Sequence, residues 1–240
     1  MNGSIKMVLP KLDHIVILLP VSPTPEALLA HAHPFTAHFS LSPGGFHTRR
    51  QSQNVLISLA DGVYLELIAF TSDNPSGDHR WARGRKPTRI IDFAFRGHPE
   101  TGSEAYREGI PGGRGNCRWV VTMPREEWGI AEIPFWCEDV TPREWRVPTP
   151  KEHPSGVQAV TKITILVDSR KERERIRKQY CTFVGERETI YVGTPSGENV
   201  QIDLRLAESE EERTALNKDG QGIYKVEFDI PGVVLSNSDF

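Results

Sequence analysis

The sequence predicts an α+β fold built from repeated βαβββ units, in which a strand and a short helix precede three more strands. Three observations support this fold class. The order of strand and helix patterns recurs along the 240 residues, each repeat opens on an apolar, β-branched run, and each closes on a strand with an acidic residue. The opening strands carry His14, Asp92 and Lys162, and the closing strands carry Glu66, Glu138 and Asp203.

The first unit, residues 1–70, has the clearest elements. Residues 12–19 are apolar, rich in β-branched side chains and bounded by prolines, which predicts a buried strand. A short helix is expected over residues 23–30, where Thr24 can cap the helix and Pro25 suits its first position. A Pro-Gly-Gly turn follows, and then two strands, residues 54–59 and 64–70, flank the hairpin signal Asp61-Gly62.

The second unit, residues 89–140, repeats this order with weaker signals. It lies between a basic linker, residues 71–88, and a proline-rich linker, residues 141–157. A strand is expected over residues 89–95 and a short helix over 104–108. Two more strands are expected over residues 118–121 and 134–138.

The third unit, residues 158–230, opens on a strand over residues 160–167. A charged helix is expected from residue 170 to 180. Further strands are expected over residues 189–193, 199–204 and 224–228. The three units are expected to form one compact domain.

Composition limits the partners and the compartment. A formal net charge of −3 provides no strong positive field, so nucleic acid is not expected as the main partner. The three cysteines form no Cys-x-x-Cys pair, which suits a reducing compartment. The sequence shows no signal-peptide core and no apolar run long enough for a bilayer, so we expect a cytoplasmic protein with no membrane partner.

Several short motifs resemble the glyoxalase-like domains of the vicinal oxygen chelate (glyoxalase/bleomycin resistance/dioxygenase) superfamily. The resemblance extends over residues 12–206 and is most specific in the first unit. It rests on the Leu-Asp-His-Ile-Val run at residues 12–16, on Pro-Gly-Gly-Phe-His at 43–47 with Asn54, on Tyr-Leu-Glu-Leu at 64–67, and on residues 134–139 and 153–156.

The resemblance implies that two units pair, so that their strands form a cupped, partly open mixed sheet. Metal ligands in this superfamily come from the first and last strands of each unit. Its members include lyases, isomerases, ring-cleaving dioxygenases, thiol transferases and metal-free binding proteins. The resemblance therefore implies the fold more firmly than it implies a reaction.

His14 and Glu66 are the main candidate metal ligands under this resemblance. Each is a polar residue within an apolar strand, where a carboxylate is costly unless it is paired or binds a cation. A buried His–Glu hydrogen bond is the alternative. One divalent ion (Zn, Mn, Fe, Ni or Co) or no ion at all would suit the site.

The sequence leaves open which unit completes the set. Pairing of the first and third units would add Lys162 and Asp203, and pairing of the first and second would add Asp92 and Glu138. Asp203 is included as a third candidate metal ligand. Lysine is a poor ligand because it is an ammonium ion at neutral pH, so a buried Lys162–Asp203 ion pair is the preferred interpretation of those two residues.

His47 and Glu138 are the candidate catalytic residues for proton transfer, although an exposed loop position would also explain His47. Candidate substrate-binding residues are Asn54, Arg49, Trp136 and Arg83. The favoured function is a glyoxalase-like lyase or isomerase that acts, with metal assistance, on a small oxygenated metabolite. A metal-free binding protein and a ring-cleaving dioxygenase are the alternatives. Whether the cup closes within one chain or across a homodimer is left open.

Overall fold

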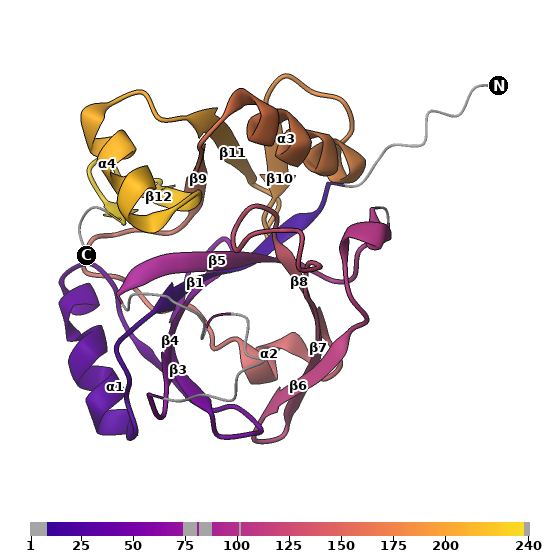
Figure 1. Ribbon diagram of the computed structural model, residues 1–240. Helices are drawn as coiled ribbons and strands as arrows, with labels where there is room; N and C mark the ends of the chain where they lie inside the picture. The colour runs from indigo at the N-terminus through magenta and orange to yellow at the C-terminus, as the bar shows by residue number, and fades with distance from the viewer. Residues whose placement is uncertain (1–8, 74–80, 82–87, 101, 238–240) are drawn as a thin grey trace.

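The computed structural model describes residues 9–73, 81, 88–100 and 102–237. It confirms the predicted α+β class, with a large mixed sheet and few helices (Figure 1). The first unit comprises β1 (Lys11–Leu18), α1 (Pro25–Ala32), the 3-10 helix η1 (His33–Ala37), β2 (Ser42–Phe46), β3 (Ser52–Ser58) and β4 (Tyr64–Phe70).

Helix α1 begins where the sequence places its cap. The Thr24 side chain accepts a hydrogen bond from Ala27 N at 3.3 Å, and Pro25 occupies the first turn. The helix buries Leu28 and Ala32 on the side that faces the sheet. It ends two residues later than expected and continues into the 3-10 turn η1.

The second unit differs from the expected pattern in its helix. Only a three-residue 3-10 turn forms, and the glycine-rich stretch after it pairs as an edge strand. Gly115, with φ +55°, makes the hairpin between the two strands that follow this turn. The unit comprises β5 (Arg89–Arg96), η2 (Ser103–Ala105), β6 (Ile110–Arg114), β7 (Cys117–Thr122) and β8 (Phe135–Asp139), and α2 (Arg143–Arg146) follows it.

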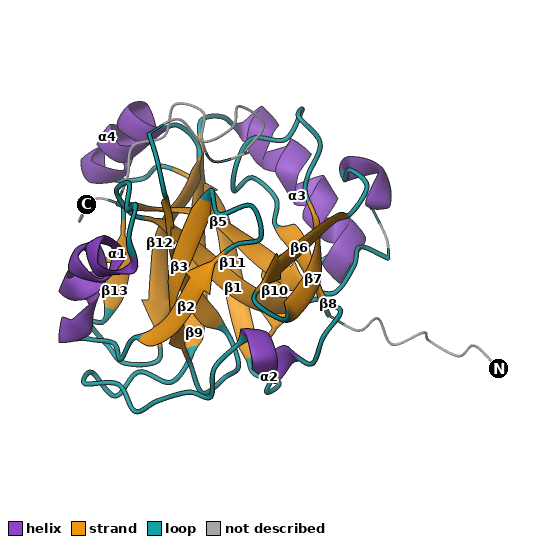
Figure 2. Cartoon of the chain, turned by 90° about the horizontal axis from the view of Figure 1, so that it is seen from below, coloured by secondary structure: helices purple, strands orange, loops and turns teal. Residues whose placement is uncertain are grey.

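The first and second units pair through their opening strands. β1 and β5 run antiparallel, β1 also pairs in parallel with β4, and β5 pairs in parallel with β8. The strand order β2-β3-β4-β1-β5-β8-β7-β6 therefore forms one curved sheet, which we call the cup. Figure 1 shows the cup as a ring of strands, and Figure 2 shows α2 at one end of these strands.

The two edges of the cup meet within one chain. Thr48, just after β2, donates from its backbone N to the carbonyl oxygen of Gly113 in β6 at 2.9 Å, and its hydroxyl donates to the same oxygen at 2.9 Å. Arg114 in β6 donates to the side-chain oxygen of Asn54 in β3 at 3.0 Å. The cup therefore needs no second chain to bring its edges together.

The third unit forms a second sheet behind β1 and β5. It comprises β9 (Val160–Val167), α3 (Arg170–Val184), β10 (Ile190–Gly193), β11 (Asn199–Leu206), α4 (Glu210–Asp219), β12 (Gly222–Phe228) and β13 (Val234–Ser236). This back sheet joins the cup through one pair of residues, Lys11 in β1 and Gly193 in β10. The main hydrophobic core fills the space between the two layers, and Figure 2 shows α1, α3 and α4 around the outside of the strands.

The third unit matches the expected strand–helix order and adds an unexpected helix. α3 begins at its Ser169 cap and ends before Gly185. α4 begins with a reciprocal capping box between Ser209 and Glu212. No helix in the described residues combines the length and the apolar character needed to cross a membrane.

Candidate functional site

A set of polar side chains lies inside the cup. On β1, Ile15 and Ile17 belong to the main core behind the sheet, whereas Val16 and Leu18 belong to the smaller apolar cluster inside the cup. His14 lies on the same face as Val16 because side chains alternate along a strand. Glu66 is paired with Val16 across the β1–β4 ladder.

The Glu66 carboxylate lies between two imidazoles. Its Oε2 is 3.6 Å from His14 Nε2, and its Oε1 is 3.5 Å from His47 Nε2. Asn54 donates a hydrogen bond to Oε1 at 2.6 Å. Burial alone raises the pKa of a carboxyl group, but the hydrogen bond and charge of His47, the charge of His14 and the Asn54 hydrogen bond outweigh burial and lower the pKa of Glu66 to about 2.

His14 is held from its other side by the residue that precedes it. Its Nδ1 is 2.7 Å from Oδ2 of Asp13, and its ring stacks on Tyr64 with 4.6 Å between the ring centroids. Burial raises the pKa of Asp13, but the charges of Arg146 and Arg143 and the bond to His14 hold it well below its usual value. Asp13 therefore only accepts, so Nδ1 of His14 carries a proton, and Nε2 faces Glu66.

Asp13 and His14 are neighbours in the chain, and both can point into the cup because β1 is irregular between Leu12 and His14. The register between β1 and β5 shifts between Leu12 and His14. Strict alternation would place Asp13 on the opposite face from His14. Strand periodicity does not select Asp13 for this reason, and the Asp-His dipeptide in an apolar strand is the signal that could have identified it.

Two arginines from α2 complete the buried network. Arg146 donates to Asp13 Oδ2 at 3.1 Å, to Asp139 Oδ1 at 2.7 Å and to the Tyr64 hydroxyl at 2.5 Å. Arg143 pairs with both Asp13 and Asp139. The two guanidinium charges thus balance the two aspartates. Both arginines lie in the linker that the sequence analysis treated only as a proline-rich connection.

His47 is the part of the network that reaches solvent. Its side chain is 22% exposed, compared with 4% for His14. Its Nδ1 is 2.7 Å from the hydroxyl of Ser52, and its ring lies edge-on to Trp119 at 6.0 Å. The two imidazoles near Glu66 therefore differ in exposure, one buried and one open to water.

The other residues selected from the sequence lie elsewhere. Trp136 shares a face of β8 with Glu138, as expected, but that face is outside the cup: Trp136 packs in the main core and Glu138 is exposed. Arg49 is exposed on the turn after His47. Arg83 lies outside the described residues.

Asp203 is also far from the cup network in the fold. It lies in β11 of the back sheet, where its neighbours Ile202 and Leu204 face the main core. Its carboxylate is 3.2 Å from Lys162 Nζ, so the expected ion pair is present. The two side chains are 21% and 31% exposed, so the pair is only partly buried.

The residues in the cup do not fit the four-ligand metal set of the resembled superfamily. The antiparallel pairing of β1 with β5 relates the two units, because His14 pairs with Ala94 and Val16 pairs with Asp92. Asp92 therefore occupies the position in the second unit that His14 occupies in the first, and Ala94 is the equivalent of Val16. Asp92 already accepts hydrogen bonds from the Trp81 indole at 2.9 Å and from a backbone N–H.

The position that corresponds to Glu66 also lacks a ligand. In the first unit Glu66 pairs with Val16, and in the second unit Phe135 pairs with Ala94, the equivalent of Val16. The apolar ring of Phe135 therefore occupies the position where a second carboxylate ligand would be needed. No group of three or more His, Cys, Asp or Glu side chains is arranged to hold a metal ion in the part of the chain that the structure describes. We therefore derive the chemistry of the site from its side chains.

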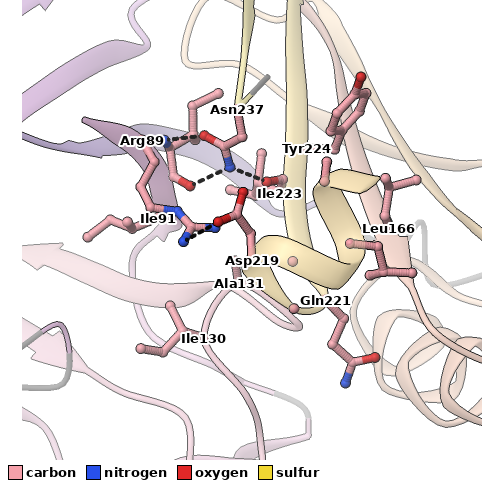
Figure 3. Close-up of a pocket in the computed structure, with 15 residues that line it drawn as sticks. Arg89, Ile91, Ile130, Ala131, Leu166, Asp219, Gln221, Ile223, Tyr224 and Asn237 are labelled. Carbon is pink, nitrogen blue, oxygen red and sulfur yellow. Dashed lines mark hydrogen bonds and ion pairs between the residues drawn. The ribbon is translucent and has the colours of Figure 1, made fainter. Parts of the chain in front are cut away.

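The pocket shown in Figure 3 is not the cup. It lies between α4, β12 and β5, where Arg89 pairs with Asp219 at 3.2 Å and Asn237 bonds to the backbone of Ile90 and Ile223. Its volume of about 20 Å³ holds about one water molecule. This pocket is too small for a metabolite.

Comparison with known proteins identifies the family and the fold. Residues 12–181 match the family model described as a glyoxalase-like domain. No curated protein sequence matches the chain. Among solved structures, a protein from Staphylococcus aureus described as hypothetical aligns with a TM-score of 0.54 and 11% identity, over 82% of this chain and 86% of that one. This alignment supports the fold alone.

Two further solved structures have lower scores. A methylmalonyl-CoA epimerase from Mycobacterium tuberculosis aligns with a TM-score of 0.40 and 13% identity, over 59% of this chain and 95% of that one. A xylose isomerase-like TIM barrel/4-hydroxyphenylpyruvate dioxygenase fusion protein aligns with a TM-score of 0.47 and 13% identity, over 92% of this chain and 36% of the fusion.

Proposed function

The chain belongs to the glyoxalase-like domain family, and from this premise we propose that it is an enzyme that transfers protons on a small oxygenated metabolite, as an isomerase or a lyase. The observation that supports this proposal is the ionised carboxylate of Glu66 held between the imidazoles of His14 and His47. Imidazoles exchange protons near neutral pH, whereas a carboxyl group with a pKa of about 2 stays ionised.

In the proposed reaction, His14 is the base. Its Nε2 takes a proton from a carbon next to a carbonyl group. The electron pair of the broken C–H bond forms a C=C bond, and the π pair of the carbonyl group moves to its oxygen, which gives an enolate. Asp13 on one side and Glu66 on the other stabilise the imidazolium that forms. The protonated form of His47 returns a proton to the substrate, and its exposure lets it exchange protons with water.

Metal assistance was the favoured expectation from the sequence, and the residues in the cup do not support it. The second unit contributes Phe135 and an already bonded Asp92 at the positions where further ligands are needed. The proposal therefore assigns the proton transfers to side chains. It predicts that purified protein holds well below one divalent ion per chain.

Proton exchange with solvent tests this function without knowledge of the product. The protein is incubated in ²H₂O with a panel of small 2-oxo acids, 2-hydroxy acids and hydroxyketones, and loss of each α-proton signal is followed by ¹H NMR. The proposal expects at least one compound to exchange. His14→Gln and His47→Gln should each slow that exchange by about 100-fold or more.

His33→Gln is the matched control, because His33 is exposed at the start of η1 and outside the cup. It should exchange at the wild-type rate. Exchange that is unchanged in His14→Gln, or no exchange with any compound of the panel, would contradict the proposal.

A further inference from the structure

Arg114 differs from the other charged residues of the cup. It lies in β6 opposite Cys117, whose side chain belongs to the apolar cluster inside the cup. Its Nη1 donates to the side-chain oxygen of Asn54 at 3.0 Å, and its Nη2 donates to the backbone oxygen of Arg146 at 2.7 Å. Both acceptors are neutral.

The charge of Arg114 is therefore not matched by a carboxylate. Asp13 and Asp139 pair with the two arginines of α2, and Glu66 lies between its two imidazoles. Within the described ranges, no carboxylate lies within ion-pair distance of Arg114. One guanidinium charge thus remains without a counter-charge at this edge of the cup.

Arg114 is also held close to the proposed chemistry. Asn54 joins it to Glu66, because the Asn54 amide oxygen accepts from Arg114 while its nitrogen donates to Glu66 Oε1 at 2.6 Å. The same nitrogen is 3.3 Å from Nε2 of His47. A group bound at Arg114 would therefore lie one amide side chain away from the carboxylate and the exposed imidazole.

We infer that Arg114 binds a carboxylate group of the substrate. A guanidinium carries five N–H donors in a planar fork that suits a carboxylate, and the hydrogen bonds of Arg114 to Asn54 and Arg146 use two of them. A single unmatched positive charge fits a monoanion better than a phosphate dianion, because Glu66 already places a negative charge nearby. This inference rests on the proposed function and names its substrate class, a small oxygenated carboxylic acid.

Pyruvate and its neutral amide, pyruvamide, are the probes. They differ in the group that Arg114 would recognise, and binding is measured by titration followed with ¹H–¹⁵N NMR. Pyruvate should bind at least about tenfold more tightly than pyruvamide, because hydrogen bonds to charged groups are stronger than neutral ones. Equal affinity of the two, or no binding of pyruvate, would overturn the inference without using any variant.

Arg114→Met should lower the affinity for pyruvate about tenfold and leave that for pyruvamide nearly unchanged. Arg118→Met is the matched control, because it removes the same charge from an exposed side chain that donates to the backbone oxygens of Gly115 and Cys117 at the β6–β7 hairpin. If Arg114→Met disturbs folding, Arg114→Lys, which keeps the charge but loses the planar fork, should bind pyruvate with intermediate affinity.

Arg114 could instead have a purely structural role, in which it only holds Asn54 and α2 together. In that case Arg114→Lys should prefer pyruvate over pyruvamide as strongly as the wild-type protein does, and that result would overturn the inference. Failure of the proposed function would be seen in proton exchange and not in the preference for pyruvate. His14→Gln should lose proton exchange but keep the preference for pyruvate, because His14 does not contact Arg114. Carboxylate-selective binding without any exchange would contradict the proposed function and leave the inference intact.

Discussion

Oδ2 of Asp13 lies 2.7 Å from Nδ1 of His14, and this contact decides which nitrogen of the imidazole faces Glu66. Because Asp13 stays ionised between two arginines, it can only accept a hydrogen bond. The buried imidazole therefore carries a proton on Nδ1, and its neutral form is the Nδ1-protonated tautomer. Its Nε2 is the nitrogen that lies 3.6 Å from the Glu66 carboxylate.

Asp13→Asn should change the tautomer of His14. An amide at this position can donate as well as accept, so the Nε2-protonated form should appear beside the Nδ1-protonated form. Two-bond ¹H–¹⁵N NMR of the histidine rings distinguishes the two tautomers. Ser52→Ala is the control, because Ser52 contacts His47 and should leave the His14 signals unchanged. Unchanged His14 signals in Asp13→Asn would show that Asp13 does not fix the ring.

Arg146→Met should destabilise the fold by about 3–5 kcal/mol, since it leaves the buried carboxylate of Asp13 with Arg143 alone, which Asp13 must share with the half-buried Asp139. Urea unfolding measures the change. Arg213→Met removes an arginine from an exposed pair on α4 and should cost no more than about 1 kcal/mol. Equal losses in the two variants would mean that the buried network does not stabilise the cup.

The stability of the protein should depend on the ionisation of Glu66. The folded state lowers the pKa of Glu66 from 4.5 to about 2, so the folded state binds this proton less readily than the unfolded chain. The resulting contribution, about 3 kcal/mol, is complete above pH 4.5 and is lost as the pH falls towards 2. Glu66→Gln should lack this part of the acid destabilisation when unfolding is followed from pH 6 to pH 3. Identical pH profiles for the two proteins would contradict the assignment.

Gly44→Ala should disturb the site through Asn54. A Cβ atom at Gly44 would lie 2.1 Å from the side-chain oxygen of Asn54 and 2.3 Å from its backbone oxygen, so β2 or β3 must shift. We expect a loss of about 1–3 kcal/mol in unfolding free energy and altered NMR signals of the Asn54 side-chain amide. Gly193→Ala in β10 is the control, because its nearest contact would be 3.8 Å. Undisturbed Asn54 signals in Gly44→Ala would argue against the close approach.

Much of the fold was predictable because the strongest strands carry their own signals. The β-branched run at residues 12–19 corresponds to β1 at Lys11–Leu18, and the charged helix expected from residue 170 begins there. The short second helix failed because glycine and proline soon follow it, which leaves only the 3-10 turn at Ser103–Ala105. α4 was missed although Ser209 and Glu212 have the spacing of a capping box.

The candidate site was predictable only where strand alternation is regular. His14 and Glu66 lie on the cup face of their strands, as alternation indicates. Asp13 was missed because a register shift turns it into the cup, which no periodicity shows. Glu138 was selected by its place in a repeat, but the register between β5 and β8 puts Phe135 at the equivalent position. Arg114 and Arg146 reach the site by long-range packing, which a single sequence does not encode locally.

A ¹³C NMR titration of the Glu66 carboxyl carbon, assigned by comparison with Glu66→Gln, is the most direct test of the proposed chemistry. The proposed chemistry requires this group to be a permanent anion between His14 and His47, with a pKa of about 2. We therefore expect the Glu66 carboxyl carbon to keep the chemical shift of a carboxylate from pH 8 down to about pH 4. Protonation of Glu66 anywhere within that interval would contradict it.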